Sequence, residues 1–352
     1  MMRMKKVMIA SGGTGGHIYP ALALAEEIRR QNEACTVIFI GSRSRMEATI
    51  IPEHGYRFIP LDVKSTKGGI LVKMAAVFSM LQMKKKCIAL LKQERPDVCI
   101  GFGNYISVPL IMAARQLHIP TMISEQNSAM GKANRFLARF VDAIEVAYPS
   151  SAIGLTKEKV RVLGNPQGSF VLHQSWPALP HEKPLVLCMM GSLGSTSVSK
   201  ALDDALPWLD HDFEVLIVTG KANPYVFQHL RQGIQTVPYT DGAAMLKACA
   251  LAVLRAGATT LCEAAALQVP SILIPSPYVP NNHQVHNAMT FVEAGAAVMI
   301  EEKNLDGRKL ALCINTLMQD PQRRAQMAVQ AGKLAKPMAA PQMVQWLREL
   351  AG

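Results

Sequence analysis

Residues 6–28, KVMIASGGTGGHIYPALALAEEI, contain the pattern that decides the fold of this chain. A short apolar run predicts a strand, a glycine-rich stretch predicts a turn, and apolar residues at helical spacing follow from Pro20. The turn at residues 11–17 carries four glycines and a histidine but lacks the Lys-Ser/Thr of a P-loop. It offers backbone N–H groups at a helix N-terminus, where an anion is favoured.

The same alternation of short apolar runs and helix-length segments continues along the chain, which predicts parallel strands joined by crossover helices. The pattern restarts after Pro184, so we expect two βαβ halves. We place the boundary where Gly-Asn-Pro interrupts the chain, giving domains 1–163 and 164–336, and we expect a loop at 167–183. A last helix at 342–350, within a segment 337–352, could cross back to the first domain. The remaining expected strands are 36–40, 98–100, 121–124, 143–147, 185–190, 215–219, 251–254 and 271–274.

Composition excludes several classes of protein. Of 352 residues, 49% are hydrophobic and 18% charged, which is typical of a chain that folds around a core. The apolar stretches are shorter than the roughly 18 residues of a membrane-spanning helix, and the start resembles no signal peptide, so we expect a cytoplasmic protein. The seven cysteines include no Cys-x-x-Cys pair and are expected to be reduced, buried thiols.

The excess positive charge lies in the first half of the chain. Residues 1–165 hold 23 Lys and Arg against 12 Asp and Glu, whereas residues 166–352 hold 14 of each. This asymmetry indicates an anionic partner for the first half: a nucleic acid, a membrane surface or a phosphorylated ligand. A nucleic-acid role is disfavoured because no binding module is recognisable and the basic residues are not interleaved with aromatic ones.

Polar or glycine-rich turns follow the ends of several expected strands. Because ligands bind at the carboxyl ends of parallel strands, turns on the same half should share one crevice. In that setting His17, at a helix start that disfavours a protonated imidazole, is a candidate general base, or a residue that only orients a ligand. The other turns are 101–105 and 125–127 in the first half, and 191–194, 255–260 and 282–284 in the second.

Several motifs together resemble a known family of enzymes. They are GGTGGHIYPALALAEEI, GFGNYISVPLIMAA, SEQN, GNP, RAGATTLCEAAA and NNHQVHNA. The chain is similar over nearly its whole length to the MurG family, within glycosyltransferase family 28. These peripheral membrane enzymes add N-acetylglucosamine (GlcNAc) to lipid I and so make lipid II for peptidoglycan. The resemblance implies a GT-B fold: two Rossmann-like, doubly wound parallel-sheet domains facing a cleft, with the C-terminal helix returning to the first domain.

The resemblance also implies roles for individual residues. UDP-GlcNAc would bind mainly to the second domain, with Glu263 on the ribose and Gln284 on the GlcNAc hydroxyls. The acceptor, lipid I, would lie against the first domain, and His17 or Glu125 would take the proton of its muramyl 4-hydroxyl in an inverting displacement. No Asp-x-Asp metal motif is present, and neither a metal nor a cofactor is expected. The remaining expected binding residues are Thr14, Gly15, Gly16, Tyr105, Asn127, Ser192, Thr240, Arg255, Ala258, Thr259, Thr260, Leu261, Cys262 and Asn287.

This chain departs from the family pattern at three places. Gly168 stands where an arginine usually follows Gly-Asn-Pro, Leu251 replaces an aspartate, and the second-domain turn reads Met-Gly-Ser-Leu-Gly instead of Gly-Gly-Ser-Gln-Gly. The missing arginine removes a cationic contact to the donor, which would cost about 1–3 kcal/mol of binding free energy.

The stretch 70–91 is largely apolar and rich in lysine. An apolar face bordered by lysines suits an anionic bilayer, although a core helix with a solvated basic end would show the same pattern. We expect the first domain to dock here on the cytoplasmic face of the plasma membrane. The lysines of this patch are Lys73, Lys84, Lys85 and Lys86.

Alternative functions remain open from the sequence. The chain could glycosylate another lipid, such as a diacylglycerol. It could be a nucleotide-sugar epimerase of similar fold, although no clear pair of acid/base carboxylates is present. It could also be a degenerate copy that binds a nucleotide sugar without turnover, for which Gly168 and Leu193 are the support.

Overall fold

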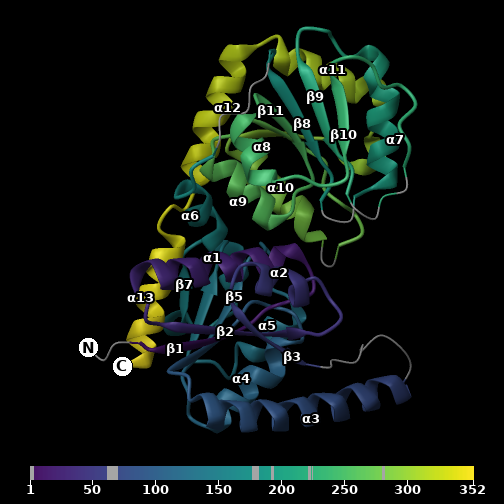
Figure 1. The fold of residues 1–352 in the computed structure, drawn as a ribbon. Coiled ribbons are helices and arrows are strands. Elements are labelled where there is room, and N and C mark those ends of the chain that lie inside the picture. The colour runs from purple at the N-terminus through teal and green to yellow at the C-terminus, as the bar shows by residue number, and fades with distance from the viewer. Residues whose placement is uncertain are drawn as a thin grey trace. The chain divides into compact units, whose positions relative to one another are not determined.

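The computed structural model describes residues 4–61, 70–176, 182–191, 194–220, 223, 225–279 and 282–352, with the side chains of 70–78 excluded. The chain forms two compact units, Met1–Phe170 with Met338–Gly352, and Val171–Pro337 (Figure 1). The N-terminal segment of the first unit thus extends to residue 170, whereas the sequence placed the boundary between the domains after residue 163. The Ser169 hydroxyl accepts a hydrogen bond from Ala340 N at 3.0 Å, which ties this stretch to the C-terminal helix.

The first unit is built on a seven-stranded sheet in the order β3-β2-β1-β4-β5-β6-β7, and every pairing is parallel. Its strands are β1 (Lys6–Ala10), β2 (Thr36–Ser42), β3 (Arg57–Leu61), β4 (Val98–Gly101), β5 (Thr121–Glu125), β6 (Ala143–Val146) and β7 (Val160–Val162). Its helices are α1 (Gly15–Gln31), α2 (Glu47–Glu53), α3 (Ile70–Glu94), α4 (Ser107–Gln116), α5 (Lys132–Leu137), η1 (Pro149–Ala152), η2 (Lys157–Lys159) and α13 (Ala339–Ala351), with α6 (Pro166–Leu172) at its edge.

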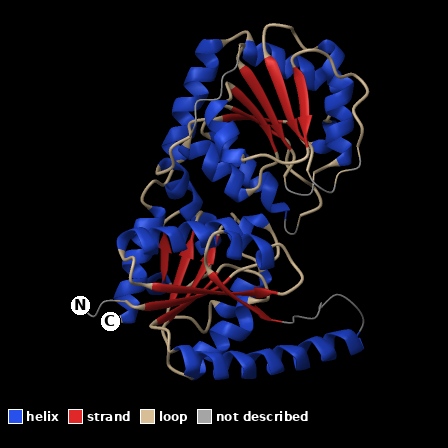
Figure 2. Ribbon diagram, in the orientation of Figure 1, coloured by secondary structure: helices blue, strands red, loops and turns tan. Residues whose placement is uncertain are grey.

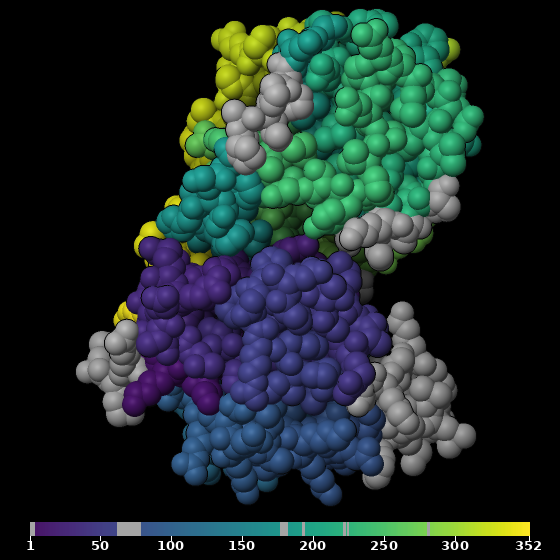
Figure 3. All heavy atoms as spheres, in the orientation of Figure 1, coloured from purple at the N-terminus to yellow at the C-terminus, as the bar shows by residue number. Residues whose placement is uncertain are grey.

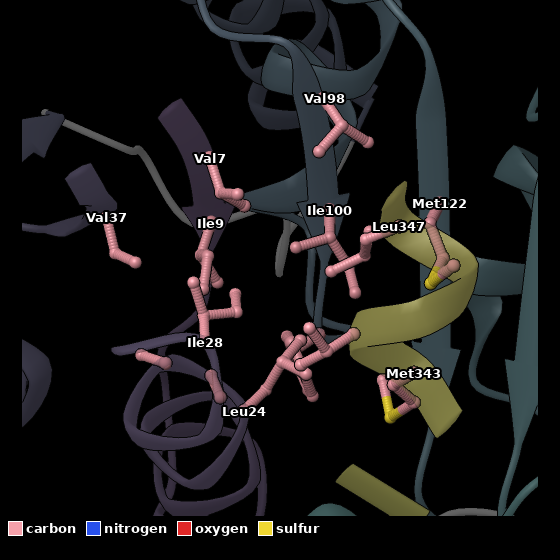
Figure 4. Close-up of a cluster of buried hydrophobic side chains, with 14 of the residues drawn as sticks. Val7, Ile9, Leu24, Ile28, Val37, Val98, Ile100, Met122, Met343 and Leu347 are labelled. Atoms are coloured by element: carbon pink, nitrogen blue, oxygen red, sulfur yellow. The ribbon is translucent and has the colours of Figure 1, made fainter. Parts of the chain in front are cut away.

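Both faces of this sheet are buried. Successive residues of a strand point to opposite faces, so Val7 and Ile9 belong to one apolar cluster and Met8 to the other. Helices α1 and α13 cover the first face, where Met343 and Leu347 pack in the same cluster as Leu24, Ile28, Ile100 and Met122 (Figure 4). Helices α3, α4 and α5 cover the second face. The C-terminal helix therefore completes the core of the first unit, as the sequence led us to expect.

The second unit repeats this architecture with six parallel strands in the order β10-β9-β8-β11-β12-β13. Its strands are β8 (Leu185–Met189), β9 (Glu214–Val218), β10 (Ile234–Val237), β11 (Leu251–Leu254), β12 (Ser271–Leu273) and β13 (Ala297–Met299). Its helices are α7 (Thr196–Ala205), η3 (Leu206–Trp208), α8 (Gly242–Ala248), α9 (Ala258–Ala266), α10 (His283–Glu293), η5 (Glu302–Asn304), α11 (Gly307–Met318) and α12 (Pro321–Leu334).

Helices flank both faces of this sheet as well (Figure 2). Apolar residues of α7 and α11 pack on one face, and those of α8, α9 and α10 pack on the other. Figure 3 shows all heavy atoms in the same orientation, coloured along the chain.

The strand orders locate a switch point in each unit. In the first, successive strands lead from β1 outward to β3, and the chain then returns to pair β4 on the other side of β1. In the second unit the switch lies between β8 and β11. The crevice beyond the carboxyl ends of the strands at such a point is the usual ligand site of a doubly wound sheet. The turns that follow β1, β4, β8 and β11 are the glycine-rich turns noted in the sequence.

Several local expectations are corrected by the structure. Helix α1 begins at Gly15 and not at Pro20, because the Thr14 carbonyl accepts from the amides of His17 and Ile18. The stretch expected to be a loop after residue 167 begins inside helix α6. Short strands β3, β7, β10 and β13 were not predicted. All seven cysteines are free thiols, of which Cys35, Cys87, Cys99 and Cys188 are buried and the other three are partly buried.

Candidate functional site

The first glycine-rich turn is held by two side chains from neighbouring segments. The buried Glu47 carboxylate accepts from Gly13 N at 3.0 Å and from Ser42 N at 2.9 Å. The Asn104 amide donates to the Gly12 carbonyl at 2.9 Å. A β-carbon on Gly12 or Gly13 would lie 2.2 Å or 2.3 Å from these two side chains, so both positions require glycine. Glu47 also takes the Gly13 amide, which the sequence had left open for an anion.

His17 lies where the turns after β1 and β4 meet. Its Nδ1 is 3.4 Å from the Thr14 hydroxyl, and Ser11 donates to its carbonyl at 2.8 Å. The ring packs against Gly103, where a β-carbon would lie 2.9 Å from Cδ2 and 3.0 Å from Nε2. The side chain is partly exposed, and Thr14 and Gly16 beside it are exposed. The imidazole is therefore accessible at the switch point of the first sheet.

Glu125, the second candidate base, is engaged by its own loop. Its carboxylate is buried and accepts from Asn127 N at 3.2 Å, Asn127 Nδ2 at 3.1 Å, Gly131 N at 2.9 Å and Asn134 Nδ2 at 3.0 Å. A carboxylate offers about four acceptor positions, and these donors occupy them. The arrangement makes Glu125 the residue that shapes loop 126–131 and places Asn127.

A second buried carboxyl group, Glu145, lies beneath the same loop. Ser124 donates to Glu145 Oε2 at 2.5 Å, and Gln126 Nε2 donates to the Ser124 hydroxyl at 2.8 Å. Burial raises the pKa of Glu145 well above its usual value, and the neighbouring Glu125 raises it further, while the Ser124 and Gly164 hydrogen bonds oppose the change. Glu145 supports the loop through its hydrogen bond from Ser124, to which Gln126 is bonded in turn.

The turn after β8 leads into helix α7 in the second unit. Gly191 and Gly194 have φ of +83° and +72°, and a β-carbon on Gly194 would lie 2.1 Å from the Thr219 carbonyl oxygen. Only glycine fits at residue 194, because the turn lies directly on the end of β9. Ser195 caps α7 by accepting from Val198 N at 3.5 Å. Ser192, an expected phosphate contact, lies outside the described residues.

Helix α9 follows β11 after a three-residue turn and carries both buried and partly exposed residues of the motif. Ala258 and Leu261 are buried, and Leu261 N donates to Gly257 O at 2.9 Å. The expectation that Leu261 lines a binding site is not supported, because its side chain lies in the core and its amide is already bonded. The partly exposed residues of this helix are Thr259, Thr260, Cys262 and Glu263.

Three further residues expected to bind a ligand are bonded to the protein itself. Asn287 is fully buried and donates to the Ala256 carbonyl at 3.1 Å, which fixes the turn before α9. Gln284 Oε1 accepts from Ser276 N at 2.8 Å. The Arg255 guanidinium pairs with Glu302 at 2.6 Å. Gln284 is partly exposed, whereas Asn287 and Arg255 are buried and belong to the framework of the site.

Thr240 lies on the turn between β10 and α8 and is partly exposed. Asp241 ends this turn and caps α8 by accepting from Ala243 N at 3.1 Å and Ala244 N at 3.2 Å. The backbone at Thr240 is therefore held in place. Tyr105, on the turn after β4, is also partly exposed, next to Asn104.

The basic helix α3 has one face in the core and one in solvent. Met83, Cys87 and Leu91 are buried at helical spacing, whereas Lys85 and Lys86 are exposed and Lys84 is partly exposed. The side chain of Lys73 lies outside the described residues. On the same unit a second group of exposed side chains lines a surface pocket on and after α5: Lys132, Arg135, Phe136 and Arg139.

The described part of the chain offers neither a membrane span nor a metal cluster. Within it, no helix is both long enough and apolar enough to cross a bilayer. Nor do three His, Cys, Asp or Glu side chains gather there in a way that could hold a metal ion.

Comparison with known proteins places this site in a family. Residues 7–146 match the glycosyltransferase family 28 N-terminal domain, and residues 185–343 match its C-terminal domain. The chain is 36% identical to the UDP-N-acetylglucosamine–N-acetylmuramyl-(pentapeptide) pyrophosphoryl-undecaprenol N-acetylglucosamine transferase of Limosilactobacillus fermentum, covering 98% of each chain. The chain belongs to glycosyltransferase family 28.

Solved structures agree with the family 28 assignment. The crystal structure of MurG from Acinetobacter baumannii matches with a TM-score of 0.78 and 28% identity, covering 98% of this chain and 99% of that one. The GT-B fold and the resemblance to the MurG family that the sequence indicated are confirmed. A UDP-GlcNAc 2-epimerase from Neisseria meningitidis bound to UDP-GlcNAc also matches, with a TM-score of 0.72 over 98% of this chain and all of that one, but at 13% identity it shares only the fold.

Sequence reasoning missed the residues that hold the family 28 motifs in place. Each lies in a segment remote from the motif that it supports and carries no local signal of its own. Their burial and their partners become visible only once the fold is known. These residues are Glu47, Asn134 and Glu302.

Proposed function

We propose that this protein transfers GlcNAc from UDP-GlcNAc to the 4-hydroxyl of the muramyl unit of lipid I, with inversion, releasing lipid II and UDP. The observation that carries the proposal is 36% identity, over 98% of the chain, to a transferase named for this reaction. The partly exposed motif residues at the switch points of both sheets support it, because ligands of doubly wound sheets bind there.

The donor would bind the second unit. Backbone amides at the N-terminus of α9 suit a diphosphate, and Glu263 one turn further on can accept from the ribose hydroxyls. The Thr240 backbone would contact the uracil, and Gln284, whose Oε1 is held by Ser276 N, would offer Nε2 to the GlcNAc hydroxyls. The remaining donor contacts in this proposal are Ser192, Ala258, Thr259, Thr260 and Cys262.

The acceptor would lie against the first unit, where His17 acts as general base. A neutral imidazole can take the proton of the muramyl hydroxyl as its oxygen attacks the anomeric carbon and the bond to UDP breaks. The charge that develops on UDP would be stabilised by N–H groups fixed at helix N-termini. Asn127, which makes two hydrogen bonds to Glu125, would contact the acceptor or the transferred sugar. The other acceptor contacts in this proposal are Thr14, Gly15, Gly16 and Tyr105.

Membrane docking of the first unit is part of the proposal. The exposed lysines of α3 and the cations beside Phe136 on α5 would face an anionic bilayer at the cytoplasmic side, where lipid I is held. The triple charge reversal Lys84→Glu, Lys85→Glu, Lys86→Glu should reduce sedimentation with phosphatidylglycerol vesicles. Reversing three exposed lysines of the second unit, Lys200, Lys247 and Lys309, changes the net charge equally and should leave sedimentation intact. Equal losses in both triple variants would contradict docking through α3.

The choice of acceptor is tested by product analysis. Purified protein is incubated with UDP-GlcNAc and either a lipid I analogue or a diacylglycerol, and the lipids are analysed by mass spectrometry and NMR. We expect one added GlcNAc, β-linked to the muramyl 4-hydroxyl, on the lipid I analogue alone. Transfer to diacylglycerol would support the alternative lipid acceptor. Donor binding without transfer to any lipid would support a degenerate, non-catalytic copy.

A further inference from the structure

Arg255 and Glu302 form a buried ion pair in the second unit. The distance from Nη1 to Oε2 is 2.6 Å, and the side chains are only 10% and 9% exposed. Arg255 directly follows β11, and Glu302 begins η5, 47 residues further along the chain. The ion pair thus joins the segments that follow β11 and β13, at the carboxyl ends of these strands, and is largely shielded from solvent.

The pair also reaches two other segments at the same edge. Arg255 Nη1 donates to the Ile274 carbonyl, just after β12, at 3.1 Å. Its Nη2 donates to the Ser195 hydroxyl at 2.6 Å, and the Ser197 hydroxyl donates to Glu302 Oε1 at 2.6 Å. Ser195 caps α7 and ends the turn that begins at Gly191. The ion pair therefore connects the start of α7 with the turn that leads into α9.

These contacts decide what the guanidinium can do. Three of the five N–H donors of the Arg255 guanidinium bond to a carboxylate, a carbonyl and a hydroxyl of the protein, and its charge is matched by Glu302. A cation intended for a phosphate would instead point its donors at the ligand. A buried ion pair is also weak evidence for stability, because desolvation offsets much of its attraction. The role left for the pair is structural, because its contacts join the start of α7 to the turn that leads into α9.

We propose that Arg255 and Glu302 are positioning residues that hold the α7 and α9 helix starts at the spacing a nucleoside diphosphate requires. The proposal rests on the proposed function, because that function places the donor diphosphate at these helix starts. Glu302 acts through Arg255 and Ser197, and neither member of the pair touches the donor.

The substitution Glu302→Gln separates positioning from direct contact. If Arg255 bound the diphosphate, removing the competing carboxylate would leave UDP affinity unchanged or raise it. If the pair positions the α7 and α9 helix starts, the affinity for UDP should fall by about tenfold, as for a lost charged hydrogen bond. The affinity for uridine, which lacks the phosphates, should stay unchanged. Both affinities can be measured by calorimetry or ligand-detected NMR on the full chain.

Two further variants complete the experiment. Glu301→Gln is the matched control, because the neighbouring Glu301 pairs with Lys303 at the surface, where the two side chains are 42% and 72% exposed. It should bind UDP as the wild type does. Ser197→Ala removes one hydrogen bond from Glu302 and leaves the ion pair, so it should weaken UDP binding by a few-fold while folding is preserved. Circular dichroism and thermal unfolding verify that each variant is folded.

Unchanged or tighter UDP binding by Glu302→Gln would overturn the inference, and so would an equal loss for UDP and uridine, which would indicate a general effect on folding. A wild-type protein that binds neither UDP nor UDP-GlcNAc would instead overturn the proposed function, and this inference with it. The two failures are distinguishable because the first concerns the variant and the second the wild type.

Discussion

The carboxylate of Glu47 accepts the amide of Gly13 at 3.0 Å, in the middle of the glycine-rich turn that the sequence singled out. A buried acid from α2 thus holds a turn that follows β1, and it also accepts Ser42 N at the end of β2. The turn places His17 and is itself rigid because Glu47 and Asn104 secure its two central glycines.

Replacing Glu47 by alanine should loosen this turn. Two buried amides would lose their acceptor, so we expect the free energy of unfolding to fall by about 1–3 kcal/mol in urea titrations. Acceptor-dependent transfer should fall more than tenfold, whereas UDP affinity should not change, because the proposed donor site lies in the second unit. Glu53→Ala, an exposed acid on the same helix, should leave both quantities unchanged. A loss of UDP affinity in the Glu47 variant would contradict this account.

Alanine at residue 194 should remove donor binding. The new β-carbon would lie 2.1 Å from a backbone oxygen, and the turn must shift to relieve the clash. Gly191→Ala is the control, because residue 191 has a similar φ of +83° but open space at the β-carbon. It should cost only backbone strain, about 1–2 kcal/mol, and keep most of the UDP affinity. Similar affinities in the two variants, measured by calorimetry, would mean that the turn does not contact the donor.

The sequence predicted the fold well because the decisive signals are local. Apolar runs, glycine turns and helical spacing identified nine of the thirteen strands in the described part of the chain, and the two-unit plan. It failed where the local signals are weak or interrupted: α1 starts before Pro20, β3 contains Pro60, β7 and β13 are three residues long, and two of the four residues of β10 are polar.

The candidate site was predicted in its positions but not in its roles. The motifs fall at the strand ends, as expected for parallel sheets. Arg255, Asn287 and Leu261 nevertheless belong to the framework, and Glu125 shapes a loop. Whether a polar residue faces a ligand or the protein depends on partners far away in sequence, such as Glu302 for Arg255, and no spacing rule reveals them.

Glu145 should make stability depend on pH. Because its pKa is raised in the folded state, the folded protein keeps a proton that the unfolded chain loses above about pH 4.3. The free energy of unfolding should therefore fall as pH rises, by about 1.4 kcal/mol per pH unit, until the carboxyl group ionises in the folded state. Glu145→Gln should remove this slope and be more stable than the wild type at pH 7. Glu158→Gln, at an exposed site, should keep the slope, and a slope that persists in Glu145→Gln would refute the assignment.

Asp203 should have the opposite dependence. Burial would raise its pKa, but hydrogen bonds from Gln228 N, His229 N and the Tyr225 hydroxyl lower it below the usual value. Its stabilisation is present above the unfolded pKa, near pH 4, and is lost as pH falls through the folded pKa. Asp203→Asn should lower the free energy of unfolding by about 1–3 kcal/mol at pH 7, with a smaller difference below pH 4. The exposed neighbour substitution Asp204→Asn should change little, and comparable losses in both would contradict the network.

The most direct measurement is UDP release from UDP-GlcNAc with and without a lipid I analogue, for the wild type and for His17→Ala. The account predicts release by the wild type only when the acceptor is present. It predicts a loss of about a hundredfold or more in the variant, with unchanged UDP affinity, because the base is removed and the donor site is not. Wild-type protein that binds UDP-GlcNAc but releases no UDP with any muramyl acceptor would contradict the central claim.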